Sequence, residues 1–128
     1  MVVREEKGQA AVELALTLPL LLLILFTLVE FGRVFFAYLV ITNAAREGAR
    51  LAAVGGSDVA IVNRVKDAAA GLEQSKLQVE VSPPASDRVS GATAVVKVSY
   101  PINLFLPLPQ GILSNPVVLK AQVSMRVE

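Results

Sequence analysis

The hydrophobic and polar positions divide the chain into stretches of different period. From Leu14 to Val29 no residue is charged, and only Thr17 and Thr27 have polar side chains. A lipid hydrocarbon core about 30 Å thick takes about 20 helical residues, within a range of about 17 to 25. The apolar run has sixteen residues and reaches this range only with its flanks. We therefore expect residues 9–31 to form one transmembrane helix.

The helix is predicted to continue beyond the membrane. Residues 30–54 contain no proline. Apolar or small side chains recur there at steps of three and four, which indicates one apolar helix face; they are Val34, Tyr38, Ile41, Ala45, Gly48 and Ala52. Gly55 and Gly56 can adopt the left-handed C-cap that ends a helix. The prediction is one helix over about residues 9–54, about 70 Å long at 1.5 Å per residue, with half of it in lipid.

A second, shorter helix is expected over residues 57–72, with Ser57 or Asp58 as its N-cap. Its apolar stripe is Ile61, Val65, Ala68 and Leu72. We expect this stripe to pack on small residues of the first helix, which allow a close approach: Ala45, Gly48, Ala49 and Ala52.

The period then changes to two, which is typical of strands with one solvated face. Alternation over residues 77–81, 93–100 and 117–127 predicts three strands. The predicted fold class is α+β, with a three-stranded antiparallel sheet on the projecting half of the long helix. The last connection, residues 101–116, is rich in proline, leucine and phenylalanine. We expect its apolar side chains to be buried beneath the sheet, and the alternative is an exposed docking patch.

Composition excludes most catalytic chemistry. The chain has no cysteine and no histidine, so it lacks thiolate ligands, disulfides and the commonest general base. No GxSxG motif or phosphate-binding glycine loop is present, so we expect no enzyme, no metal or other cofactor and no small-molecule substrate. A net charge of +1, without basic patches between aromatic residues, argues against nucleic acid.

The beginning of the chain carries unusual charges. Residues 1–8 form a charged head. Its Arg4 and Lys7 favour an N-terminus on the cytoplasmic side. Glu13 lies at the start of the apolar segment, where a carboxylate is costly and is a functional-site hypothesis. Its simpler interpretation is an interfacial side chain that reaches water. Pro19 removes a helix hydrogen bond, so we expect a kink there. The membrane exit is assigned to Glu30, Phe31, Gly32 and Arg33.

The order of charged head, Gly8, Glu13 and apolar run resembles the class 3 signal of type IV prepilins. That resemblance implies that a prepilin peptidase cuts after Gly8 and leaves the apolar segment attached. Gln9, where pilins usually have phenylalanine, becomes the new N-terminus. Glu13 is then the fifth residue and contacts the N-terminal amine of a neighbouring subunit.

A longer stretch resembles the N-terminal signature of TadE-like proteins, the pseudopilins (minor pilins) of the Tad/Flp pilus system. The matching features are the GxxxVE start, Pro19, the exit at residues 30–33 and the stretch at residues 43–50. The ending AQVSMRVE is similar to the last strand of that family. The resemblance implies a pilin-like fold with a cleaved leader at residues 1–8, a transmembrane and assembly helix at residues 9–31, and an extracytoplasmic domain at residues 32–128.

The same resemblance implies a location and partners. The protein would be a single-pass protein of the bacterial inner membrane with its C-terminal domain in the periplasm. Its partners would be the prepilin peptidase, other pseudopilins or pilins and the assembly platform, and its place could be in the fibre, at the tip or at the base. The alternative is a membrane-anchored extracytoplasmic binding module that is not cleaved. A cleaved secretory signal is disfavoured because the apolar run is long and no small-x-small site follows it.

Overall fold

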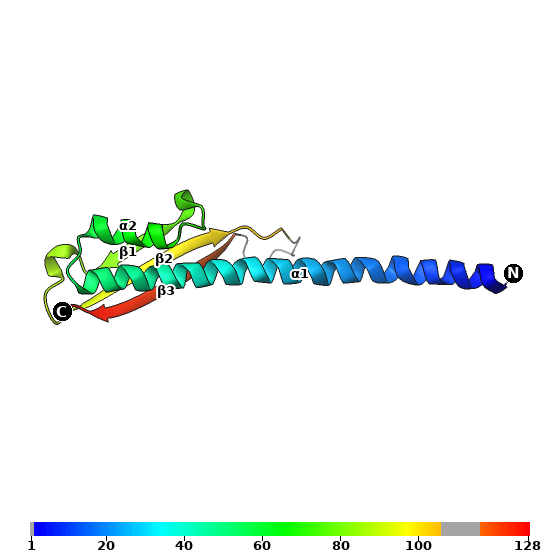
Figure 1. Cartoon of the computed structure of the whole chain (residues 1–128), viewed down its shortest axis with the longest axis horizontal. Helices are drawn as coiled ribbons and strands as arrows, with labels where there is room; N and C mark the ends of the chain where they lie inside the picture. Colours follow the sequence, from blue (N-terminus) through cyan, green and yellow to red (C-terminus); the bar gives the residue numbers. More distant parts are fainter. Residues whose placement is uncertain (1, 106–115) are drawn as a thin grey trace.

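The protein is an elongated α+β molecule in which one long helix extends far beyond a small sheet domain (Figure 1). The structure, a computed structural model, describes residues 2–105 and 116–128. Its helices are α1 (Val2–Ala53) and α2 (Asp58–Ala68), and its strands are β1 (Gln78–Ser82), β2 (Thr93–Ile102) and β3 (Val117–Arg126). Short 3-10 turns occur at Gln74–Lys76 and Ala85–Asp87. The predicted fold class is confirmed.

Helix α1 has 52 residues and a length of about 78 Å. The predicted start near residue 9 is wrong, because the helix already begins at Val2. Arg4, Glu5, Glu6 and Lys7 are good helix formers, and Glu5 in the first turn complements the helix dipole. The helical assignment continues through Pro19 without a break, and a kink there stays a prediction. The predicted end is confirmed: Gly55 has φ +88°, and the Gly56 amide donates to the Leu51 carbonyl over 3.0 Å.

The second half of α1 packs on the sheet and α2 through small side chains. Its buried residues are Ala37, Ile41, Ala44, Ala45, Gly48, Ala49, Ala52 and Ala53. The predicted face is therefore confirmed at most positions, but Tyr38 is 45% exposed. Each residue turns a helix by about 100°, and Ala37 rather than Tyr38 faces the core.

Helix α2 begins with Ser57 as its N-cap, whose hydroxyl accepts a hydrogen bond from the Ala60 amide over 3.2 Å. The helix ends at Ala68 and not at residue 72. The Gln74 side-chain amide ends it by donating to the carbonyls of Lys66 and Ala69, over 3.2 and 3.0 Å. Ile61 and Val65 are fully buried. A methyl group on Gly48 would lie 2.5 Å from Cγ2 of Val65, so the predicted close approach of the two helices is confirmed.

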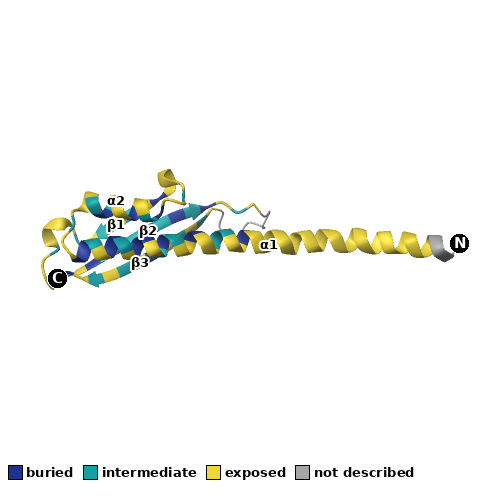
Figure 2. Ribbon diagram, in the orientation of Figure 1, coloured by how far each residue is buried: buried dark blue, intermediate teal, exposed yellow. Residues whose placement is uncertain are grey.

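The sheet is antiparallel in the order β1-β2-β3. Val96 lies opposite Val81 on one side and Val123 on the other. Strand β2 alternates between half-buried or exposed and buried residues, and the buried set is Ala94, Val96, Val98, Tyr100 and Ile102. This face contacts α1, so the core lies between sheet and helices (Figure 2).

Arg88 holds the loop between β1 and β2 against the turn between the helices. Its side chain is only 3% exposed and forms a 2.6 Å ion pair with Asp58. It also donates to the carbonyls of Pro83 and Gly56, over 3.0 and 3.1 Å. Polar contacts of Arg88 therefore hold the loop and the helix turn together at the end of the domain far from the N-terminus.

The connection after β2 departs from its prediction where it can be followed. Ile102 is buried, but Phe105 is 77% exposed, so burial of the apolar loop is wrong at this residue. Leu104 is half-buried. The remainder of the predicted apolar stretch, residues 106–115, lies outside the described residues.

Candidate functional site

The first half of α1 has no protein packed against it. Every residue from Glu5 to Val29 is exposed, and burial begins at Glu30 (Figure 2). Large side chains dominate this half, with Leu16 75% and Leu28 62% exposed. Among the described residues one helix is long and apolar enough to cross a membrane. This surface points to a single membrane anchor.

The predicted processing residues lie on regular helix. Gly8 and Gln9 are exposed, and a Cβ on Gly8 would have no neighbour within 4 Å. The peptide bond between them therefore lies in an exposed turn of the helix. A peptidase that binds an extended chain has to unwind this turn, and glycine lowers the cost of unwinding because it weakens helices.

Glu13 lies one turn beyond Gln9, about 6 Å along the axis and on the same side of the helix. Its side chain is exposed. The hydrogen bond at this residue is made by its backbone carbonyl, which accepts from the Thr17 hydroxyl over 2.7 Å. The described part of the chain supplies no ion pair to the Glu13 carboxylate.

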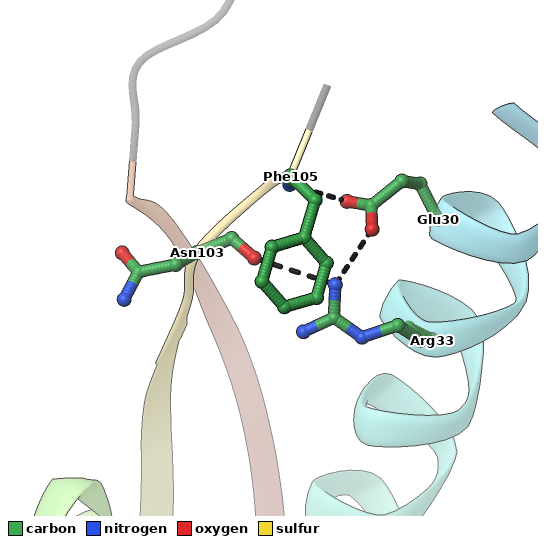
Figure 3. Close-up of polar contacts among 4 residues, drawn as sticks. All are labelled: Glu30, Arg33, Asn103 and Phe105. Carbon is green, nitrogen blue, oxygen red and sulfur yellow. Dashed lines mark hydrogen bonds and ion pairs between the residues drawn. The ribbon is translucent and has the colours of Figure 1, made fainter. Parts of the chain in front are cut away.

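The second carboxylate of the apolar helix, Glu30, has partners within the chain (Figure 3). It is only 6% exposed. Its Oε1 accepts from Nη1 of Arg33 over 2.7 Å, and its Oε2 accepts from the Phe105 amide over 3.1 Å. Arg33 also donates to the Asn103 carbonyl over 3.5 Å. The guanidinium carbon lies 4.3 Å from the centre of the Phe105 ring, within the range of a cation–π contact.

The helix period explains this cluster. Glu30 lies about two turns before Ala37 on the side that faces the domain, and Arg33 is one turn on from Glu30. Their side chains meet the segment that leaves β2. The sequence placed residues 30–33 at the membrane exit but gave no indication of Asn103 or Phe105 as partners. A usable signal was present, because an acidic residue on an otherwise apolar helix needs a partner and Arg33 follows at helical spacing.

Nothing in residues 2–105 and 116–128 resembles a metal centre: no three acidic, histidine or cysteine side chains are grouped so as to hold an ion. The buried side chains of Glu30 and Arg88 are held by hydrogen bonds and ion pairs.

Comparison with known proteins agrees with this description of the helix. Residues 8–50 match the family described as TadE-like protein. The match begins at Gly8 and includes Glu13, Pro19 and the Glu30–Arg33 cluster. No curated protein and no solved structure matches the chain. The matched family is in general not enzymatic. The chain is therefore similar to TadE-like proteins over residues 8–50, about a third of its length.

Proposed function

We propose that the protein is a TadE-like pseudopilin, a minor pilin that helps to assemble a Tad/Flp type IV pilus or a related secretion machine. Residues 9–31 anchor the protein in the bacterial inner membrane. The N-terminus lies in the cytoplasm, and residues 32–128 form the extracytoplasmic domain. A prepilin peptidase removes residues 1–8 by cutting after Gly8. The family match over residues 8–50 supports this function.

One observation carries the proposal, namely the different state of two carboxylates on the same helix. Glu30 is buried and bonded to Arg33 and to the Phe105 amide. Glu13 is exposed in the apolar half, and the described residues offer it no ion pair. An unpaired carboxylate within a bilayer costs roughly a few kcal/mol near the centre and less toward the interface. We infer that the partner of Glu13 is supplied by another subunit.

Cleavage after Gly8 would create a suitable partner. The new amine of Gln9 is positive, and a neighbouring chain's amine can lie beside Glu13. Opposite charges about 4 Å apart gain about 4 kcal/mol at an effective dielectric constant of about 20, against about 1 kcal/mol in water. Cleavage also removes four charged side chains that would be costly in an apolar helix bundle; they are Arg4, Glu5, Glu6 and Lys7.

The intact mass of the protein from a host with its peptidase tests the processing step. We expect the wild-type chain to lose residues 1–8 and Gly8→Leu to retain them. Gly32→Leu is the matched control, since a Cβ at either glycine meets no atom within 4 Å. A wild-type chain that keeps Met1 would contradict the proposal and favour an uncleaved, membrane-anchored binding module.

Co-purification with other pseudopilins tests the assembly contact. Glu13→Ala is expected to be cleaved normally but to lose about tenfold or more of its partner, because 1.4 kcal/mol corresponds to a factor of ten. Glu6→Ala is the control, since it changes an exposed carboxylate in the segment that is removed. Equal recovery with both variants would overturn the role of Glu13.

A further inference from the structure

The exposed apolar surface of α1 does not end at the Glu30–Arg33 pair. Phe31, Phe35 and Leu39 are 69%, 53% and 52% exposed. After Arg33, the first exposed side chain with a charge or an amide is Asn43. The apolar exposed side of the helix therefore runs from Leu14 to Leu39, about 39 Å at 1.5 Å per residue.

This length exceeds what the hydrocarbon core alone can cover. The core is about 30 Å thick, and a bilayer with both headgroup layers is about 40 to 45 Å. With Leu14 at the edge of the core, Glu30 and Arg33 lie about 24 and 29 Å along the axis. The ion pair is then still at the level of the lipid chains, and Phe35 to Leu39 lie in the headgroup layer.

The bonding of the ion pair suits that level. A charge beside lipid is tolerated when it is paired, and both charges of this pair have partners within the chain. The Phe105 ring lies over the guanidinium of Arg33 while 77% of the residue remains exposed. Phe105 thus covers the Arg33 guanidinium with one face of its ring and exposes the remaining apolar surface.

We propose that Phe31, Phe35, Leu39 and Phe105 form a membrane-docking surface, the interfacial girdle, which holds the near end of the domain in the headgroup layer of the bilayer. Its occupant is lipid, because Phe31, Phe35 and Leu39 continue the exposed apolar surface of the anchor, and Phe105 lies over Arg33 of the same helix. Aromatic rings are favoured where lipid chains meet water. Phe105, shortly after the end of β2, then touches the membrane directly. This inference needs only the membrane anchor and is independent of processing after Gly8.

Depth-dependent quenching of tryptophan fluorescence tests the girdle. The chain has no tryptophan, so Phe35→Trp and Phe105→Trp each introduce a single probe into the full-length protein. Phe26→Trp, at a 59% exposed site within the anchor, is the deep control. Val54→Trp is the control outside the membrane, since Val54 is 63% exposed and about 22 Å beyond Leu39 along the helix direction. The probes are phosphatidylcholine vesicles with bromine on the lipid chains, either near the headgroup or near the chain ends.

We expect bromine near the headgroup to lower the emission of Phe35→Trp and Phe105→Trp by about half or more, because both sites lie close to the edge of the hydrocarbon core. Phe26→Trp is quenched more by bromine near the chain ends, and Val54→Trp by neither lipid. The proposal is overturned if the two girdle variants are quenched no more than Val54→Trp. Blue-shifted emission without quenching also overturns it, since protein and not lipid would then cover the site. Circular dichroism of each variant shows that the helix is retained.

Discussion

The two halves of α1 have the same backbone conformation but very different surroundings. Residues 5–29 are exposed throughout, and nine of the sixteen residues from Leu14 to Val29 are leucine. The later half buries a line of alanines and one glycine against the sheet and α2; the line includes Ala37, Ala44, Ala45, Gly48, Ala49 and Ala52. Both surfaces are apolar, so side-chain size rather than polarity distinguishes them. Large side chains suit fluid lipid, whereas small ones let a sheet and a second helix approach the backbone.

The largest expected effect comes from shortening one side chain in each half. Ile41 is fully buried and Leu23 is 53% exposed. Ile41→Ala should lower the free energy of unfolding of the domain by about 2 to 5 kcal/mol, because it leaves a cavity in the core. Leu23→Ala should leave it unchanged. Hydrogen exchange of the β2 amides, with the full chain in detergent micelles, measures both. Equal protection in the two variants would contradict the division of α1.

Glycine substitutions test close packing in the same way. Gly48→Ala forces a methyl group to 2.5 Å from Val65, a stiff side chain, so we expect a loss of about 1 to 3 kcal/mol. Denaturant unfolding, monitored by hydrogen exchange of the β2 amides, gives this change in the free energy of unfolding. A variant as stable as the wild type would mean that a Cβ at residue 48 lies further than 2.5 Å from Val65.

Glu30 tests the boundary between the halves. Glu30→Ala leaves Arg33 and the Phe105 amide without their carboxylate partner, so we expect a loss of about 1 to 3 kcal/mol. Glu30→Gln keeps the shape and one acceptor, and should lose less. Amide exchange at Phe105 reports the local effect, because this amide donates to Glu30. Unchanged protection of Phe105 in Glu30→Ala would exclude the contact.

The smallest effect is expected at Gly32, where a Cβ would have no neighbour within 4 Å. Gly32→Ala should stabilise the helix by about 0.5 to 1 kcal/mol, because glycine is a poor helix former. Slower hydrogen exchange of the amides of residues 31–35 would indicate this stabilisation of the helix. Faster exchange would indicate that the glycine is required for a bend.

Much of this architecture follows from local signals in the sequence. The double glycine ends α1, Ser57 begins α2, and the alternation of residues 93–100 identifies β2, because each depends on backbone preferences of nearby residues. The early end of α2 could not be predicted, since it depends on the side-chain amide of Gln74 beyond the helix.

The candidate site was only partly predictable for the same reason. Gly8, Glu13 and the Glu30–Arg33 spacing can be identified along one helix. Asn103 and Phe105 are about 70 residues further along the chain, and only the antiparallel return of β2 brings them to Glu30. Burial of Arg88 could not be predicted either, because it depends on the position of Arg88 in the fold and not on adjacent residues in the sequence.

Because α1 is unbroken, it also fixes the relative directions of side chains that lie far apart along it. Glu13 and Phe31 are eighteen residues apart, which is about five whole turns at 3.6 residues per turn. The two side chains therefore lie on the same side of the helix, one at each end of the exposed apolar segment. The Phe31 ring also stacks on the Phe35 ring, with centroids 6.2 Å apart. An unbroken helix therefore fixes the direction of Glu13, near its N-terminal end, relative to the Phe31–Phe35 stack beside the domain.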